Sequence, residues 1–352
     1  MGCGSSSGSS DSQISSAISG MALNAAGTTM YVANADSNIV ETLNPTLVSP
    51  TVTTLAGAVG QAGTAEGTTT ASAGRFYSPV GITQMGGDLY VADTGNSGIR
   101  KLTVAGVISN LAGNLGTAGS ADATGSSATF FYPKGIANDG TYLYVADTYN
   151  HTIRRVTTAG AVTTIAGYAG ASGSTDNLTG SIARFKYPYG ITTCPTVVVG
   201  CDLYVSDSGN NTIRTVTTGG AVTLLAGSPA GTAGYADRPG NLATFNGPAG
   251  VVTDGTNVFV ADSGNHTIRM IEISTGDVTT IAGAAGTYGS TDGTNGATAR
   301  FNTPTGLALN TAGTILYVSD QNYTKVRKIV LPASPTAPTS SNVTVTTLTA
   351  AF

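Results

Sequence analysis

The segment Ala261–Met270 reads ADSGNHTIRM and places a carboxylate, an amide, an imidazole and a guanidinium within eight residues. These groups belong to Asp262, Asn265, His266 and Arg269. Acidic, basic and hydrogen-bonding side chains at such spacing are the groups that hydrolytic active sites and metal sites use. Whether they carry out chemistry here depends on how often the chain repeats them.

The same pattern recurs through the chain. Copies begin at residues 89 (LYVADTGNSGIR), 143 (LYVADTYNHTIR), 203 (LYVSDSGNNTIR), 258 (VFVADSGNHTIR) and 316 (LYVSDQNYTKVR), with a degenerate copy at residue 30 (MYVANADSNIVE). An active site is needed once, whereas a structural unit is needed in every repeat. We therefore interpret the repeated acids and arginines as structural, each Arg pairing with the Asp across a hairpin. They are Asp93, Asp147, Asp207, Asp262 and Asp320, with Arg100, Arg154, Arg214, Arg269 and Arg327.

Each copy predicts a hairpin. The apolar alternation in LYV and VFV is typical of a strand that is buried on both faces. The Asp that follows is expected to accept hydrogen bonds from the backbone of the next turn, where a Gly or Asn supplies the left-handed conformation. The two histidines, His151 and His266, share one turn position, and we expect them to face solvent rather than bind a metal.

Each hairpin belongs to a larger unit of four strands. Five copies are preceded by P-x-G and, before that, by a Phe, and two further strand-like segments follow. Six units of four antiparallel strands predict an all-β protein, a six-bladed β-propeller. The phenylalanines are Phe76, Phe130, Phe185, Phe245 and Phe301.

The repeats also predict the blade boundaries. VTVTTLTA, from residue 343, resembles TVTTLAG, from residue 51, and should form the outermost strand of the last blade. Each end blade would then own four strands, and the ring would close by packing of the first blade against the last. We place a flexible Gly/Ser-rich tether at 1–13 and the propeller at 14–350, with blades at 14–57, 76–113, 130–167, 185–227, 245–283 and 301–350.

The repeated segments VADTGNSGIR, VADTYNHTIR, VSDSGNNTIR and VADSGNHTIR, each in register with P-x-G, resemble the NHL repeat family of six-bladed β-propellers. The resemblance covers almost the whole chain after about residue 14. The end units depart most from the pattern, because Asn34 replaces the turn Asp, Glu41 replaces the Arg and Tyr323 replaces the turn Asn. Atypical terminal units are expected in repeat proteins.

The composition argues against several classes of function. Only 10% of the residues are charged and the net charge is −4, so we expect no nucleic-acid partner, which would require a basic surface. No apolar run approaches the roughly 18 residues of a membrane span. The sequence contains no phosphate-binding loop before a helix, no zinc-site spacing of Cys and His, and no nucleophile–His pair outside the repeat.

Five long, glycine-rich connectors between the blades each carry an acid. One interpretation is that the glycines let the loop lie flat while the acid caps a turn. The other is a ring of acids around the channel mouth that binds a cation or a polar ligand. Calcium would suit such oxygen ligands, although we predict no cofactor and no metal. The acids are Glu66, Asp122, Asp176, Asp237 and Asp292.

Two functions from different classes remain. The first is a non-enzymatic binding or scaffolding propeller, a monomer that takes a protein or polar ligand on one face. The second is a metal-dependent hydrolase or lyase, lactonase-like, which would need a non-repeated set of polar side chains converging on the central channel. We favour the first, because the expected inner strands offer only four such groups near their ends: Asn24, Asn138, Asp254 and Asn310.

Two of the three cysteines suggest a disulfide. Cys194 and Cys201 bracket an extended hairpin in the fourth blade, where cross-strand positions can meet the geometry of a disulfide. Two buried free thiols are the alternative. A formed bond would indicate an oxidising, extracytoplasmic location.

The third cysteine lies in the opening MGCGSSSGSSDSQ. This segment resembles a bacterial lipoprotein whose signal peptide has been removed, so that Cys3 would carry the lipid and the Gly/Ser stretch would act as the tether. Two alternatives are an N-myristoylation signal with palmitoylation at Cys3 and an artificial leader sequence. We expect a lipoprotein of the bacterial outer membrane or cell surface, attached to the membrane only through this lipid.

Overall fold

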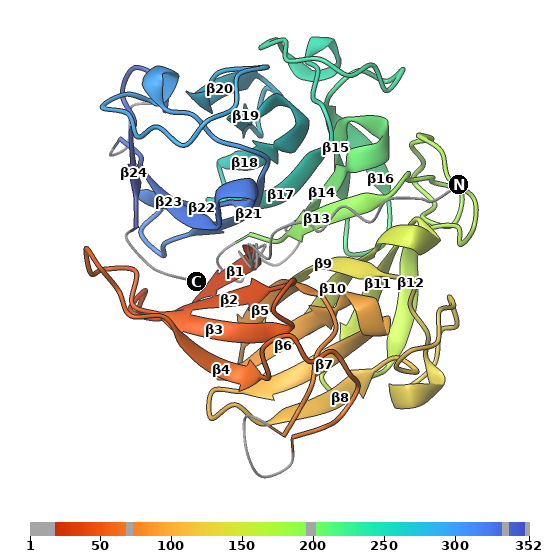
Figure 1. The fold of residues 1–352 in the computed structure, drawn as a ribbon. Coiled ribbons are helices and arrows are strands. Elements are labelled where there is room, and N and C mark those ends of the chain that lie inside the picture. The colour runs from red at the N-terminus through yellow and green to blue at the C-terminus, as the bar shows by residue number, and fades with distance from the viewer. Residues whose placement is uncertain (1–17, 68–72, 195–201, 333–337, 349–352) are drawn as a thin grey trace, which may run out of the picture.

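The computed structural model describes residues 18–67, 73–194, 202–332 and 338–348. Within these residues, six antiparallel sheets of four strands each surround a central axis (Figure 1). The predicted six-bladed β-propeller is therefore confirmed. The predicted tether at 1–13 lies outside the described residues. No helix in the described ranges is long and apolar enough to cross a membrane.

Strands in every blade are ordered from the channel outward. The first three blades contain β1 (Ile18–Leu23), β2 (Met30–Asn34), β3 (Ile39–Leu43), β4 (Thr53–Gly57); β5 (Pro79–Met85), β6 (Asp88–Asp93), β7 (Gly98–Thr103), β8 (Ile108–Ala112); and β9 (Pro133–Asn138), β10 (Tyr142–Asp147), β11 (Thr152–Thr157), β12 (Val162–Gly167). The last three contain β13 (Pro188–Thr192), β14 (Leu203–Asp207), β15 (Thr212–Val216), β16 (Val222–Ala226); β17 (Pro248–Thr253), β18 (Asn257–Asp262), β19 (Thr267–Glu272), β20 (Val278–Gly283); and β21 (Pro304–Leu309), β22 (Ile315–Asp320), β23 (Lys325–Val330), β24 (Thr344–Thr347).

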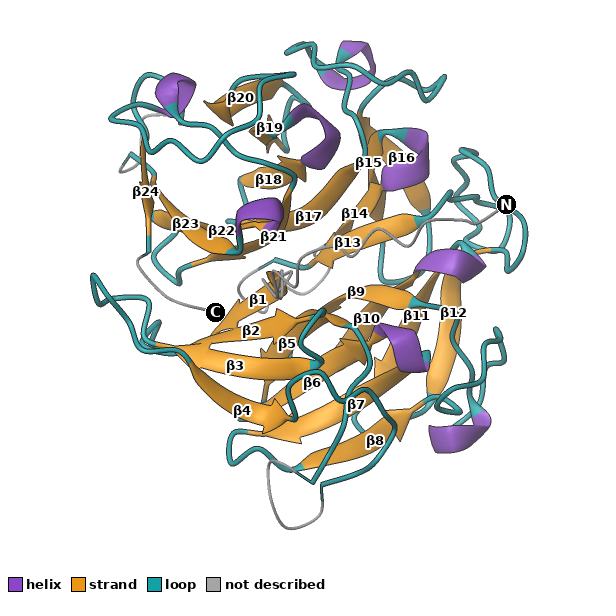
Figure 2. Ribbon diagram, in the orientation of Figure 1, coloured by secondary structure: helices purple, strands orange, loops and turns teal. Residues whose placement is uncertain are grey.

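The only helical elements in the described ranges are single 3₁₀ turns of three residues (Figure 2). Five of them follow the repeated Asp and end at a residue in the left-handed conformation. The prediction that the Gly or Asn two or three positions after the Asp supplies this conformation is wrong, because the left-handed residue is the fourth after the Asp: Ser97, His151, Asn211, His266 and Thr324. They are η1 (Thr94–Asn96), η3 (Thr148–Asn150), η4 (Ser208–Asn210), η6 (Ser263–Asn265) and η8 (Gln321–Tyr323). The connectors carry η2 (Gly125–Ser127), η5 (Gly240–Leu242) and η7 (Gly296–Thr298).

The hydrophobic core lies between neighbouring blades. Tyr90 and Ala92 of β6, for example, share one buried cluster with Phe130 and Val145 of the next blade. The second strand of each blade is buried on both faces, as the LYV alternation predicts. Because each blade buries its faces only against its neighbours, no blade completes a core alone.

The ring closes by packing and not by a shared strand. Strands β1–β4 form one complete sheet and β21–β24 form another, and β1 contacts β21 across the seam. Strand β24 is the outermost strand of the last blade and pairs with β23. Both features agree with the predicted arrangement of the end blades.

A Gly in each inner strand sets the spacing between blades and explains the P-x-G motif. A methyl group on Gly135 of β9 would lie 2.3 Å from the carbonyl oxygen of Tyr189 in β13. On Gly306 of β21 it would lie 1.9 Å from the carbonyl oxygen of Ser19 in β1, so the same contact closes the ring. Neighbouring inner strands touch backbone to backbone at this level, which only Gly allows. The equivalent positions are Gly20, Gly81, Gly190 and Gly250.

Candidate ligand-binding site

Each repeated Asp is buried against the repeated Arg of its own blade. Asp147 and Arg154 have fully buried side chains, and their closest oxygen and nitrogen atoms are 2.6 Å apart. The guanidinium also donates to the carbonyls of Thr129 and Ala121, and it lies 5.0 Å from the ring centroid of Phe130. The structural pairing of Asp and Arg is therefore present, and the repeated Phe lies against each Arg. Equivalent pairs at 2.9–3.0 Å are Asp93–Arg100, Asp207–Arg214, Asp262–Arg269 and Asp320–Arg327.

The second role predicted for this Asp, capping the turn that follows it, is wrong. One carboxylate oxygen of Asp147 accepts from the N–H of Phe131 in the preceding connector, at 2.8 Å, and the other accepts from the side chain of Asn150, at 2.7 Å. The hairpin of β10 and β11 is closed by strand pairing. The Asp147 carboxylate instead binds the connector that enters the blade, at Phe131. Burial raises the pKa of Asp147 to about 6, and the positive charge of Arg154 opposes this shift.

The first blade replaces the ion pair by an amide–carboxyl pair. The side-chain amide of Asn34 donates to Glu41 at 3.0 Å and accepts from the N–H of Ser37 at 3.1 Å. Burial raises the pKa of Glu41. The two replacements in the first blade therefore compensate for each other, because the Asn34 amide donates the hydrogen bond that the Glu41 carboxyl accepts.

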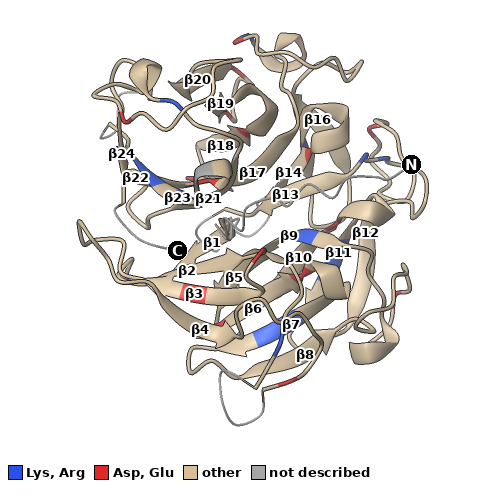
Figure 3. Cartoon of the chain, viewed as in Figure 1, with Lys and Arg blue, Asp and Glu red and all other residues tan. Residues whose placement is uncertain are grey.

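The five connector acids lie apart from one another. Asp122 bonds to Arg154 and to the backbone N–H of Thr164 in the outermost strand β12. Asp176, Asp237 and Asp292 make the same two kinds of contact in their blades, and Glu66 accepts from the N–H of Asn110. These carboxylates therefore hold the connectors over the outer strands and do not line the channel mouth, and the four aspartates among them also pair with the Arg of their own blade. The scattered charges are visible in Figure 3.

The two histidines do not simply face solvent, as the turn position suggested. His151 is buried, and its Nδ1 accepts from the N–H of Tyr187 in the next blade, at 3.1 Å. His266 accepts from the N–H of Thr303 in the same way. Each ring therefore links two blades as a neutral acceptor. Burial lowers the pKa of both.

Cys3 and Cys201 lie outside the described residues, so the disulfide with Cys194 and the lipid at Cys3 remain predictions. Among the described residues, no three side chains of His, Cys, Asp or Glu lie close enough to hold a metal ion. The described residues therefore offer no set of metal ligands to support the alternative of a metal-dependent hydrolase or lyase.

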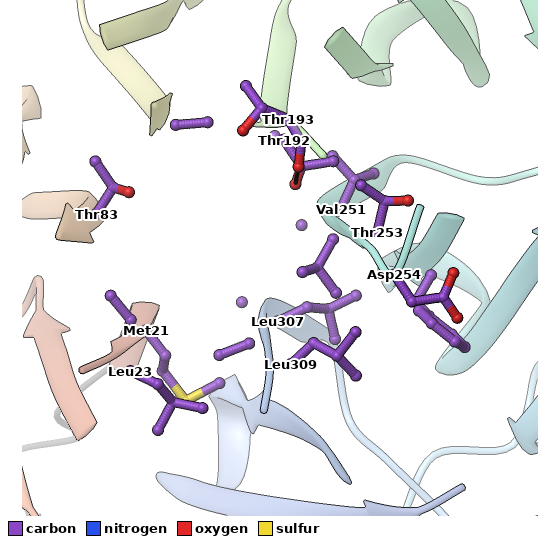
Figure 4. Close-up of a pocket in the computed structure, with 18 of the residues that line it drawn as sticks. Met21, Leu23, Thr83, Thr192, Thr193, Val251, Thr253, Asp254, Leu307 and Leu309 are labelled. Atoms are coloured by element: carbon purple, nitrogen blue, oxygen red, sulfur yellow. Dashed lines mark hydrogen bonds between the residues drawn. The ribbon is translucent and has the colours of Figure 1, made fainter. Parts of the chain in front are cut away.

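The central channel contains a cavity of about 920 Å³, lined by the inner strands of all six blades. Figure 4 shows apolar side chains from β1 and β21, including Met21 and Leu307, facing hydroxyl groups such as Thr83 and Thr192 across the opening. Of the four polar groups noted near the inner-strand ends, Asn24, Asp254 and Asn310 bind turn backbone and Asn138 bonds to the second blade.

One feature breaks the repeat: an aromatic cluster where β9 and β13 begin. Phe131, Tyr132 and Tyr149 have ring centroids 5.2–5.4 Å apart, and Tyr149 lies 5.3 Å from Tyr187 of the next blade. The three tyrosines are each more than 40% exposed. Sequence analysis missed this cluster, although Tyr132, Tyr149 and Tyr187 stand where other blades have Gly, Ser, Thr or Asn. The position of Phe131 is aromatic in the second blade as well, where it is Tyr77.

Two of these tyrosines have a left-handed backbone that the repeat imposes. Tyr132 and Tyr187 have φ of 48° and 50°, and Ser78, Gly247 and Thr303 have a positive φ at the same position of the second, fifth and sixth blades. The conformation therefore belongs to the fold, and only the aromatic side chains depart from the repeat. Because its exposed rings are that departure, the aromatic cluster is the strongest candidate for a binding site.

Two further non-repeated side chains lie directly after these tyrosines. Lys134 and Tyr189 occupy the middle position of P-x-G in their blades, and both line the channel. The ammonium of Lys134 lies 4.5 Å from the ring centroid of Tyr189. Burial lowers the pKa of Lys134 and raises that of Tyr189 to about 12. Lys134 and Tyr189 each follow a tyrosine of the cluster by two residues in the chain, Tyr132 and Tyr187 respectively.

Six four-stranded blades, five of which share a buried Asp–Arg pair, define a repeat-built six-bladed β-propeller. No family model matches the chain. It is 30% identical to human NHL repeat-containing protein 2 over 288 residues, which are 72% of this chain and 39% of that protein. With these repeats and relatives, the chain is an NHL-repeat β-propeller. It spans less than half the length of the curated relatives it matches.

Solved structures share the fold at low sequence identity. An auxiliary nutrient binding protein from Bacteroides ovatus superposes with a TM-score of 0.62 and 19% identity, over 89% of this chain and 69% of that one. Virginiamycin B lyase from Staphylococcus aureus superposes with a TM-score of 0.54 and 14% identity, over 95% of this chain and 85% of that one. At these identities the likeness shows the fold alone.

Proposed function

We propose that this propeller is a non-enzymatic binding module outside the cytoplasm, and that it takes its ligand on the aromatic cluster beside the channel mouth. The observation that carries the proposal is the cluster itself, formed by Phe131, Tyr132, Tyr149 and Tyr187. In a repeat protein, side chains present in every blade serve the fold, whereas side chains confined to one pair of blades are free to serve a ligand.

The chemistry of the cluster supports binding. Exposed aromatic rings offer a large apolar area at a small cost in conformational entropy, and each Tyr hydroxyl can also hydrogen-bond. Grouped aromatic residues on a surface mark interaction sites more often than single ones do. A binding role also fits the solved neighbours, since one of them is called a nutrient binding protein.

The repeat itself suggests the test. A Tyr132→Thr and Tyr149→Gly double variant installs residues that Thr303 and Gly264 already supply at these positions in other blades, so the fold should be retained. The control is Tyr235→Ser, which removes a lone Tyr that is 67% exposed on another connector. Both proteins and the wild type are applied to an array of purified polysaccharides and peptides. We expect the double variant to lose the wild-type signal at an unchanged Tm; full retention of that signal would overturn the proposal.

The location outside the cytoplasm is part of the same proposal, with Cys3 as the lipid anchor and Cys194–Cys201 as a disulfide. The full-length precursor, as wild type and as Cys3→Ser, is expressed with a clickable fatty acid in a bacterial host. Only the wild type should be labelled and stay in the membrane fraction. Equal retention without label would exclude the anchor. Alkylation of Cys194 and Cys201 in an oxidised sample without reductant would exclude the disulfide.

A further inference from the structure

We propose that the ligand of this site is an anionic oligosaccharide, whose sugar rings stack on the aromatic cluster while a carboxylate or sulfate group pairs with Lys134. The inference rests on the proposed function, because it names the class of ligand for the same site.

Lys134 is the only basic side chain among the described residues that line the cavity. Within the described ranges its ammonium has no carboxylate partner, and it lies over the ring of Tyr189. Burying an unpaired ammonium is costly, and this cost is expressed in its lowered pKa. The fold does not require a Lys here, since Val80 and Thr305 occupy the equivalent position in other blades. An anion supplied by a ligand would satisfy this charge.

A second cation lies on the outer side of the cluster. Lys186 is exposed, directly precedes Tyr187, and is close enough to His151 for its charge to help lower the pKa of that imidazole. Lys186 also has no ion-pair partner among the described residues. The connector acids that could oppose an anion are engaged by the arginines of their own blades. Two cations without an ion-pair partner in the described residues, Lys134 and Lys186, therefore flank tyrosines of the cluster in the chain.

The cluster suits a sugar chain better than a protein surface. A stable protein partner buries about 800 Å² per side, whereas this patch consists of four neighbouring rings. The negative face of an aromatic ring attracts the polarised C–H groups on the face of a sugar ring, and the tyrosine hydroxyls can bond to sugar hydroxyls. Lys134 follows Tyr132 by two residues, so their Cα atoms lie at most about 7 Å apart, and one short oligosaccharide can reach both.

The experiment compares three probes on the intact protein by isothermal titration: an oligogalacturonate trimer, its fully methyl-esterified form, and a sulfated trisaccharide. Esterification removes the charge and keeps the ring, so binding of the ester should be about 10- to 100-fold weaker, the range for a hydrogen bond to a charged group. Lys134→Met should weaken binding of the acidic trimer to the level of the ester. The control is Lys101→Met, which removes an exposed ammonium already paired with Asp88.

The outcomes separate this inference from the proposed function. Tighter binding of the charged probes, lost in Lys134→Met but not in Lys101→Met, would support it, and the ratio between uronate and sulfate identifies the preferred anion. Equal binding of ester and acid, lost in the Tyr132/Tyr149 double variant, would overturn the anion and leave the binding site standing. If none of the sugars binds and a proline-rich peptide does, the ligand is a peptide and the inference is wrong.

Discussion

The hydroxyl of Ser319 donates to the carbonyl oxygen of Ser19, 3.0 Å away across the seam where the last blade meets the first. The same hydroxyl accepts from the N–H of Gly306, at 2.6 Å. Ser206 makes the equivalent bonds between the fourth and fifth blades. The other four blades have Ala at this position: Ala33, Ala92, Ala146 and Ala261.

Ser319→Ala should lower the free energy of unfolding by about 1 kcal/mol, the net worth of a buried hydrogen bond. The cost should not be larger, because Ala packs at this position in four blades. Ser206→Ala is the matched control, and the two losses should add, since the seams are far apart. Urea unfolding measures both. A loss in Ser206→Ala with none in Ser319→Ala would show that the closing seam does not depend on this bond.

Asp147→Ala should destabilise the protein far more than Asp122→Asn, although both acids pair with Arg154. The first change leaves a fully buried guanidinium without its buried partner, which costs roughly 3 kcal/mol. The second removes a partner whose side chain is 43% exposed, so its loss should cost less than about 1 kcal/mol. Thermal unfolding of both variants gives the comparison. Equal losses would contradict the assignment of Asp147 as the structural partner.

The fold could be predicted from sequence because its cause is periodic. The alternation in LYV fixes strands that are buried on both faces, and six copies in register require a ring. The Asp–Arg pair could be predicted as well, because the two residues occupy diagonal positions on the same side of one hairpin, where Asp147 is opposite Thr152 and Arg154 is opposite Val145. What could not be predicted from a single repeat is which loop the carboxylate of Asp147 binds, since Phe131 comes from the preceding connector.

The candidate site was missed because it depends on departures from the pattern. A repeat is found by the residues that its copies share, such as Asp93, Asp147 and Asp207. Tyr132 and Tyr149 are instead distinguished by having no counterpart of the same type at their positions in most other blades. Their proximity also arises only after neighbouring blades pack, which brings Tyr187 beside Tyr149. A position-by-position comparison of each blade with the repeat consensus would have identified these tyrosines as departures.

Gly135→Ala should lower the free energy of unfolding by at least about 2 kcal/mol, because its methyl group would overlap the carbonyl oxygen of Tyr189. Gly219→Ala is the control: its methyl group would meet only the Thr217 hydroxyl, at 3.7 Å. The free energies of unfolding of the two variants are compared by denaturant unfolding, with one m-value used for both. If Gly135→Ala were as stable as the wild type, the inner strands would not be held at backbone contact.

His151 should make the stability of the propeller depend on pH. Its Nδ1 accepts from the N–H of Tyr187 only while the ring is neutral, and burial, with a smaller effect of Lys186, lowers its pKa below the ordinary value of 6.5. The unfolded chain therefore takes up a proton at higher pH than the folded chain does. The contribution of His151 to stability is complete above about pH 6.5 and is lost as the pH falls through the lower pKa of the folded state.

His151→Asn should remove this dependence and keep the structure. Asn211 occupies the same turn position of the next blade, with φ of 55°, and its side-chain oxygen accepts from the N–H of Gly247 at 2.8 Å. An Asn at 151 can therefore adopt the left-handed backbone and replace the acceptor without titrating. Between pH 7 and pH 5 the variant should gain stability relative to the wild type, by at most about 1.4 kcal/mol per pH unit. Urea unfolding across this range tests it, and parallel pH profiles for variant and wild type would show that His151 is not the group that titrates.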